Sequence, residues 1–165
     1  MWTIIKFDKK NIEFLKKGIK EKLGKDFIIY SPKLSIQRYK KGKLKKQEIN
    51  LLGDYLFCFH KDFSNPQMIN KLQFVKGLKY FLSGFTQSQE EIKKFIEKCK
   101  NSENQEGYLS QNFFKLSVNA KYKFASGPFA EMIFKIIDLQ KDKINVLLGN
   151  IKTTVRNDKF LFNPL

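Results

Sequence analysis

Cys58 and His60 are the residues of this chain whose types and spacing could do chemistry together. They lie two positions apart, so on a strand the thiol and the imidazole would face the same side. A thiol nucleophile also needs a third group that orients its base, and the sequence places none at a matching spacing. We therefore predict no enzyme, with Cys58 as a small core residue and His60 as a surface residue at a strand end.

The sequence also lacks the motifs that would indicate a metal or a cofactor site. Cys58 and Cys99 form no CxxC pair, and His60 is the single histidine, so a metal site is not expected. Neither a Gly-rich phosphate loop nor a GxSxG motif occurs. We expect no metal, no cofactor and no catalytic residue.

The net charge of +16 points to a polyanionic partner. Residues 1–100 hold 23 basic and 10 acidic groups, whereas residues 101–165 hold 9 and 6. Nowhere do 18 apolar residues occur together, so no membrane span is predicted. We expect a cytoplasmic monomer with reduced thiols.

The densest charge run, residues 33–46, contains seven Lys or Arg and no acid. It surrounds Lys41-Gly42-Lys43, which predicts the turn of a basic hairpin. One reading is contact with nucleic acid; the alternative, given equal weight, is a solvated edge hairpin that lysines protect from aggregation. The candidate nucleic-acid-binding residues are Lys33, Arg38, Lys40, Lys41, Lys43, Lys45 and Lys46.

The elements that must position these residues follow from apolar periodicity and turn signals. The order is strand, helix, strand, hairpin, strand, helix, strand and helix, which predicts an α+β domain with an antiparallel sheet flanked by helices. The expected strands cover residues 2–7, 27–30, 34–39, 44–50, 55–59 and 74–82, and the expected helices begin at Ile12, Pro66 and Ser88. A polar stretch, residues 100–110, is typical of a linker.

This order of motifs resembles the NusG family of transcription elongation and antitermination factors. The resemblance is carried by the strand at Trp2, the basic hairpin, the stretch LLGDYLF at residues 51–57 and the stretch VKGLKYF at residues 75–81. Residues 127–130 read GPFA, like the opening of the KOW domain that ends these proteins. The family usually has Pro where Gly53 stands, and the glycines that follow GPFA are replaced by Glu131 and Met132.

The resemblance implies three parts, namely a NusG-like N-terminal domain at residues 1–102, a linker at 103–115 and a small KOW-type β-barrel at 116–165. It implies that the N-terminal domain binds the clamp helices of the largest RNA polymerase subunit through an apolar depression. The residues carried over to that site are Leu52, Tyr55, Val75, Leu78, Tyr80, Phe81 and Leu82. Because neighbouring strand residues face opposite sides, about half of these are expected in the core.

The C-terminal domain has two self-consistent readings. Four strands at residues 121–124, 132–138, 144–148 and 152–155 predict a barrel. However, Phe129, Met132 and Ile133 also begin an apolar stripe at helical spacing, and residues 147–160 resemble the RfaH-like specialised paralogues. In these the domain docks on the N-terminal domain as a helical hairpin. In the barrel form, Phe129, Met132 and Leu148 match positions that contact a small-subunit ribosomal protein or Rho.

We expect a factor that binds RNA polymerase, lies near upstream or non-template DNA, and suppresses pausing. The alternative is a ribosome-associated RNA-binding KOW protein, since KOW modules occur in ribosomal proteins and the charge suits RNA. The sequence does not distinguish a general factor from an operon-specific one.

Overall fold

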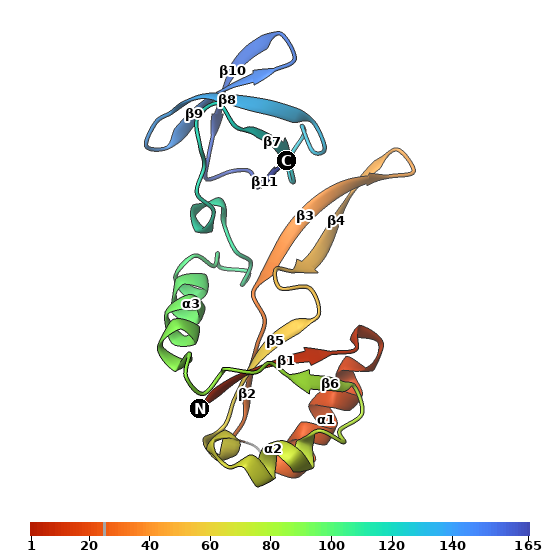
Figure 1. Ribbon diagram of the computed structural model, residues 1–165. Helices are drawn as coiled ribbons and strands as arrows, with labels where there is room; N and C mark the ends of the chain where they lie inside the picture. Colours follow the sequence, from red (N-terminus) through yellow and green to blue (C-terminus); the bar gives the residue numbers. More distant parts are fainter. Residues whose placement is uncertain (25) are drawn as a thin grey trace. The chain divides into compact units, whose positions relative to one another are not determined.

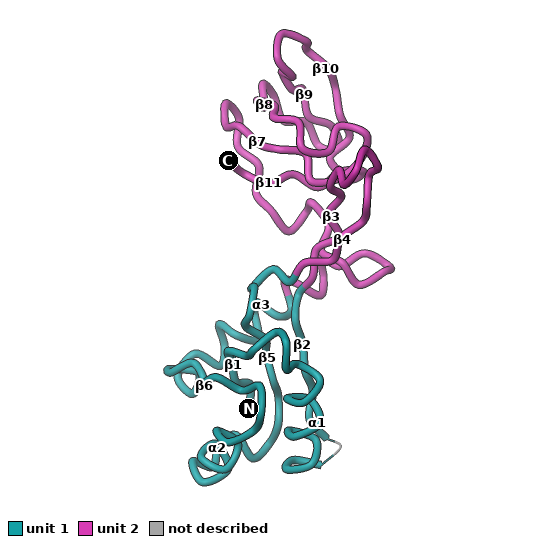
Figure 2. Tube along the Cα trace, turned by 90° about the vertical axis from the view of Figure 1, so that its right-hand side faces the viewer, with its two compact units in different colours: residues 1–32, 50–97 teal, residues 33–49, 98–165 magenta. Residues whose placement is uncertain are grey.

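The computed structural model describes residues 1–24 and 26–165, and these form two compact units (Figure 2). Unit 1 comprises Met1–Pro32 and Asn50–Glu97, and unit 2 comprises Lys33–Ile49 and Lys98–Leu165. The basic hairpin thus groups with the C-terminal residues. The predicted boundaries at 102 and 115 stay a prediction. No helix among the described residues is long and apolar enough to cross a membrane.

Unit 1 is built on an antiparallel sheet of order β2-β5-β1-β6 (Figure 1). The strands are β1 (Trp2–Phe7), β2 (Ile28–Tyr30), β5 (Tyr55–Phe59) and β6 (Leu78–Phe81). Burial alternates along β1, because its odd-numbered residues face the helices. The central pair, β1 with β5, has Ile4 opposite Phe57 and Lys6 opposite Tyr55.

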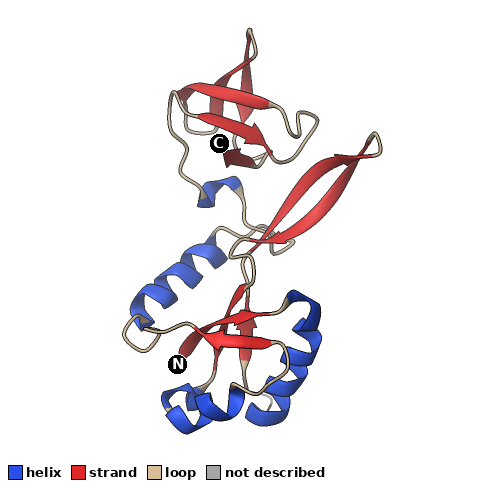
Figure 3. Ribbon diagram, turned by 45° about the vertical axis from the view of Figure 1, so that its right-hand side comes forward, coloured by secondary structure: helices blue, strands red, loops and turns tan. Residues whose placement is uncertain are grey.

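Two helices cover one face of this sheet, α1 (Ile12–Leu23) and α2 (Pro66–Leu72), each entered through a short 3-10 turn (Figure 3). The turns are η1 (Lys9–Asn11) and η2 (Lys61–Ser64). Pro66 opens α2, and the Asn65 side chain caps it by accepting from the Gln67 amide. The core under these helices consists of Ile5, Phe7, Leu15, Ile19, Leu56, Cys58, Phe63, Leu72 and Val75.

The opposite face is covered by α3 (Gln89–Asn101). Ile92 and Ile96 of this helix are buried against Phe57 of β5. The spacing of four residues places the two isoleucines on one side of the helix. One short helix leaves part of the sheet face uncovered.

The strand predicted over residues 74–82 is shorter in the structure. Residues 74–77 form a turn, and β6 begins only at Leu78. Gly77 adopts a φ of +93°, which breaks the extended backbone. Phe74 lies in this turn and is 87% exposed, so its β-forming side chain does not decide the local structure.

Unit 2 contains the basic hairpin, with β3 (Lys33–Lys40) paired to β4 (Lys43–Asn50). Lys41 and Gly42 form its two-residue loop, and both have positive φ, as primed turns require. The hairpin predicted from the Lys-Gly-Lys sequence is therefore present. At the turn, each strand extends one residue further than predicted, to Lys40 in β3 and from Lys43 in β4.

A second antiparallel sheet in unit 2 has the order β10-β9-β8-β7-β11. The strands are β7 (Lys121–Phe124), β8 (Ile133–Leu139), β9 (Lys143–Leu148), β10 (Ile151–Arg156) and β11 (Phe162–Pro164). The four predicted strands are present, and β11 adds a fifth. The sheet is not closed, because β10 and β11 are its two edges. The strands of the predicted KOW-type barrel are therefore present, but their hydrogen bonds do not close the sheet into a ring. The alternative, a helical hairpin, is not the conformation of this structure.

The segment predicted as a linker, residues 103–115, makes specific contacts within unit 2. The Leu109 amide donates to the Lys33 carbonyl at 2.8 Å. The 3-10 turn η3 (Gln111–Phe113) carries a buried Gln111, whose Oε1 accepts from the Phe162 amide at 2.7 Å. These bonds hold residues 109–111 against the hairpin and against the last strand.

Candidate functional site

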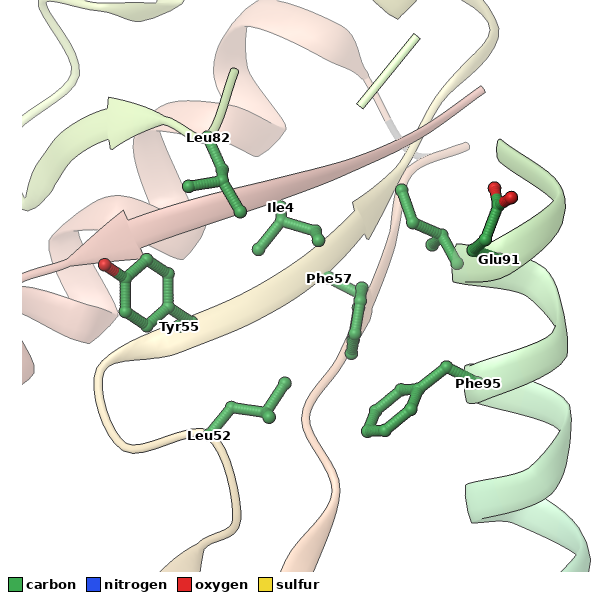
Figure 4. Close-up of a pocket in the computed structure, with 8 residues that line it drawn as sticks. Ile4, Leu52, Tyr55, Phe57, Leu82, Glu91 and Phe95 are labelled. Carbon is green, nitrogen blue, oxygen red and sulfur yellow. The ribbon is translucent and has the colours of Figure 1, made fainter. Parts of the chain in front are cut away.

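An open apolar groove of about 490 Å³ lies on the sheet face that α3 leaves uncovered (Figure 4). It is formed by β1, β5, the turn before β5, the end of β6 and one side of α3. The residues that line it are Ile4, Leu52, Tyr55, Phe57, Leu82, Glu91, Ile92 and Phe95. All of them belong to unit 1.

The floor of the groove is a row of apolar side chains across three strands. Ile4 lies opposite Phe57 on one side. On the other side, the Leu82 amide donates to the Ile4 carbonyl at 2.8 Å, directly after β6. Residues two positions apart face the same way, so Ile4 shares its face with Trp2 and Lys6. The floor therefore depends on the register of β1 between its two neighbours.

The wall of the groove is the first two turns of α3. Gln89 holds the start of the helix to β1, because its side chain accepts from the Trp2 amide at 2.9 Å and donates to the Trp2 carbonyl at 2.8 Å. Phe95 packs on Phe57, with ring centroids 5.8 Å apart. Phe95 is only partly buried, so the face of this aromatic cluster remains open toward the groove.

One end of the groove is polar. The hydroxyl groups of Tyr55 and Tyr80 are 2.9 Å apart. The Lys6 Nζ lies 5.2 Å from the Tyr55 ring and 5.7 Å from the Tyr80 ring, and 3.9 Å from the Asp54 carboxylate. Lys6 is opposite both tyrosines in the sheet. Tyr55, Lys6 and Tyr80 thus form a polar row beside the apolar floor, because Lys6 is two residues along β1 from Ile4.

The pKa directions in this row follow from its hydrogen bonds. The hydrogen bond between the two hydroxyl groups lowers the pKa of Tyr55 and raises the pKa of Tyr80. The pKa of Lys6 is raised, first by its hydrogen bond with Tyr55 and then by the Asp54 charge.

The structure divides the seven residues predicted to bind RNA polymerase. Leu52, Tyr55 and Leu82 line the groove, and Tyr80 lies beside Tyr55. The remaining three, Val75, Leu78 and Phe81, pack in or against the core under α1 and α2. The strand alternation explains this split, since Phe81 and Leu82 point to opposite faces.

Sequence reasoning missed the other groove residues, Ile4, Phe57, Glu91, Ile92 and Phe95. Two signals could have found most of them. The alternation along residues 2–7 places Ile4 on the face opposite Ile5, and the stripe after Ser88 puts Ile92 and Phe95 on one side of a helix. Neither pattern predicts which part of the sheet face the helices leave uncovered.

The predicted nucleic-acid-binding residues also fall into two groups. Lys33 forms an ion pair with Glu48 at 2.8 Å, and Lys46 pairs with Glu106 at 2.7 Å while lying over the Tyr108 ring at 5.0 Å. The Glu106 hydrogen bond raises the pKa of Lys46. The other five basic side chains are exposed toward the hairpin tip and join no ion pair within the described residues; they are Arg38, Lys40, Lys41, Lys43 and Lys45.

Of the predicted C-terminal partner residues, Leu148 lies on β9, whereas Phe129 and Met132 lie in the connection between β7 and β8. Phe129 and Met132 are exposed, and the Phe129 ring contacts Phe124 at 5.6 Å. Leu148 is half-buried and packs against the core of this sheet. Gly127 of the GPFA stretch lies against the Phe160 ring, and its amide donates to the Gln37 side chain at 2.6 Å.

The thiol of Cys58 and the imidazole of His60 are both buried. Cys58 is in the core as predicted, and burial raises the pKa of its thiol to about 12. His60 is buried too, so its placement on the surface was wrong. Its Nδ1 accepts from the Asp62 amide at 3.2 Å and thereby caps η2. A thiol with so high a pKa is a poor nucleophile at neutral pH. Within the described residues, no cluster could hold a metal ion.

Comparison with known proteins gave two kinds of result. No family model and no curated protein matches the chain. Among solved structures, it is similar to the MjSpt4:Spt5 complex in conformation B, at 15% identity over 100% of this chain and 98% of that one, with a TM-score of 0.32. It is also similar to a Thermotoga maritima NusG structure on domain interaction, at 17% identity over 99% and 96%, with a TM-score of 0.33. TM-scores this low assign no function to the chain.

Proposed function

We propose that the chain is a transcription elongation and antitermination factor that binds RNA polymerase through the apolar groove of unit 1. The observation that carries this proposal is the groove itself. Its floor and wall are mostly apolar and aromatic. Leu52 and Tyr55 belong to a stretch that resembles the NusG family, and Leu82 directly follows another. That resemblance names the clamp helices of the largest polymerase subunit as the occupant.

The groove suits a helical protein partner on physical grounds. Its lining is almost wholly apolar, and the partly exposed Phe95 and Tyr55 offer aromatic anchors. Aromatic residues in a small depression commonly dominate the energy of a protein interface. A helix tip with apolar side chains would bury these groups and release the water that now covers them.

The tip of the basic hairpin would tether the factor to upstream or non-template DNA. Its five exposed basic residues bring charge without a geometry that reads bases, because Lys contacts phosphates as a point charge. Binding at the groove and at the hairpin would hold the polymerase in its closed, translocating form. The result would be fewer pauses.

The second sheet of unit 2 would recruit a further partner, a small-subunit ribosomal protein or Rho. Phe129 and Met132 present exposed apolar surface for this contact, whereas Leu148 is half-buried and contributes less. An RfaH-like specialised role would require this region to leave its strands for a helical hairpin. We propose the general role, in which the strands persist.

The test is binding to purified RNA polymerase core enzyme, with Leu82→Asp as the variant. A carboxylate in the groove would have to be desolvated by the partner, which costs several kcal/mol, so we expect binding at least about tenfold weaker. Leu139→Asp is the control, because Leu139 and Leu82 are both 37% exposed but Leu139 lies on the second sheet. Equal effects of the two variants, or unchanged pausing with wild-type protein, would refute the proposal.

The second candidate is a ribosome-associated RNA-binding protein, which the exposed lysines of the hairpin tip favour. Parallel pull-downs of RNA polymerase and of ribosomal subunits separate the two. Retention of ribosomal subunits by the wild type, with loss in a variant that replaces Lys41 and Lys43 and none in Leu82→Asp, would support the second candidate.

A further inference from the structure

The groove has different polar groups at its two ends (Figure 4). At one end, the Tyr55 hydroxyl points away from the apolar lining and lies next to Lys6 and Tyr80. At the other end, Glu91 stands on the first turn of α3. Between these ends the lining is apolar. A partner that fills the groove therefore meets hydrogen-bond donors on one side and an acceptor on the other.

The tyrosine end has donor protons to spare. Two hydroxyl groups share one hydrogen bond of 2.9 Å, so the proton of one of them remains available. The Lys6 ammonium, which also forms a hydrogen bond with Tyr55, contributes further donors, and its nearest carboxylate, Asp54, lies at the loose distance of 3.9 Å. This end can thus donate to an additional acceptor, and a carboxylate would form charge-assisted bonds there.

The Glu91 end offers a negative charge that is not compensated locally. Glu90, its neighbour, pairs with Lys93 at 2.9 Å. Glu91 is exposed and takes part in no ion pair within the described residues. Its position in the first turn suits the helix dipole, but its side chain also borders the groove. A cation on the partner could therefore form an ion pair with Glu91.

These features select a protein partner over a nucleic acid. A phosphate backbone gains from dense positive charge. The groove and its tyrosine end present one lysine, two acids, two tyrosine hydroxyls and otherwise apolar side chains. A helical polypeptide can present apolar residues at i and i+4 and charged residues beyond them. Only this chemistry matches all three parts of the groove.

We propose that the groove binds a helical segment with a fixed polarity, whose apolar residues are flanked by a carboxylate at the Tyr55–Lys6–Tyr80 end and by Lys or Arg at the Glu91 end. This rests on the proposed function, since the segment would belong to RNA polymerase. It adds the charge pattern of the segment and its direction across the sheet. A segment with the reversed pattern would place like charges together and bind more weakly.

The experiment measures the Kd of the full chain for purified RNA polymerase core enzyme at low and high salt, using two charge changes and their matched controls. Glu91→Lys is compared with Glu90→Lys, because both alter the same turn of α3 but only Glu91 borders the groove. Lys6→Gln is compared with Lys79→Gln, which lies next to Tyr80 on β6 and influences Asp8 on the opposite face. Far-UV circular dichroism checks that each variant is folded.

We expect Glu91→Lys and Lys6→Gln to bind about three- to tenfold more weakly than their controls at low salt. The difference should shrink at high salt, because exposed charges are screened. If each variant matches its control while Leu82→Asp loses binding, the polarity is wrong and the proposed function stands. If wild-type protein does not bind the polymerase, both are refuted.

Discussion

Gly77 occupies the turn that leads into β6 and so determines where Leu82 and Tyr80 reach the groove. Its φ of +93° lies in a region that alanine adopts only with strain. A Cβ at this position would lie 2.6 Å from the Asn11 carbonyl oxygen and 3.2 Å from the Leu15 Cβ. The Gly77 carbonyl also accepts from the Asp8 amide at 2.8 Å. The turn is therefore fixed on both sides.

Gly77→Ala should lower the free energy of unfolding of unit 1 by about 2–5 kcal/mol. The positive φ contributes about 1–2 kcal/mol, and the collision contributes about 1–3 kcal/mol, because a backbone oxygen cannot rotate away. Gly84→Ala is the control. Gly84 has a φ of +82° but nothing within 4 Å of its Cβ position, so only the backbone cost of about 1–2 kcal/mol remains.

Urea unfolding followed by Trp2 fluorescence measures this difference. Trp2 is the single tryptophan of the chain, belongs to unit 1 and contacts Phe59 at a centroid distance of 5.3 Å. With a slope of about 1–3 kcal/mol per molar urea, we expect Gly77→Ala to move the midpoint about 1 M further than Gly84→Ala does. Equal midpoints, or a Gly77→Ala protein as stable as the wild type, would refute the packing argument.

Three further predictions concern the hairpin, the core thiol and the second sheet. Replacing Lys41 and Lys43 with Ala should weaken DNA binding and lower the salt slope by about 1–2, whereas replacing Lys33 and Lys46, which are ion-paired, should change the slope less; equal slopes would contradict this. Cys58 should react slowly with a thiol reagent at pH 8 and quickly in urea, because burial raises its pKa to about 12. The stability that its protonated form provides should be complete below about pH 8.5, the pKa of a thiol in the unfolded chain. It should be lost as the pH rises from there toward about 12, the pKa of the buried thiol. Far-UV circular dichroism should show strand in the isolated C-terminal domain and, in the full chain, no more helix than α1, α2 and α3 account for; additional helix in the full chain would mean fold switching.

Much of the fold could be predicted because its local signals agree with its tertiary structure. The Lys-Gly-Lys turn, the alternation from Trp2 onward and Pro66 at the start of α2 each predict an element that the structure contains. Phe74 is the exception. Its β-forming side chain counted toward a strand, but the positive φ at Gly77 and the contact with Asn11 place a turn there.

The groove was only half predictable, because periodicity assigns a residue to a face but does not say which face stays open. Leu82 and Phe81 are equally apolar, and only the packing of α1, α2 and α3 puts one in the groove and the other against the core. The ion pairs of the hairpin are a similar case. Lys46 meets Glu106 across 60 positions, a pairing that no local pattern contains.

The stretch at residues 126–139 shows how one sequence can satisfy two periods. As a strand, β8 buries Phe134 and Ile136 and leaves Ile133 and Ile137 exposed. At helical spacing, Ile133, Ile136 and Ile137 would share one face. The strand form therefore leaves exposed part of an apolar stripe that a helix would bury together. Because isoleucine lowers the stability of a helix and suits a pleated sheet, the exposed residues fit better as surface for a partner than as the core of a second fold.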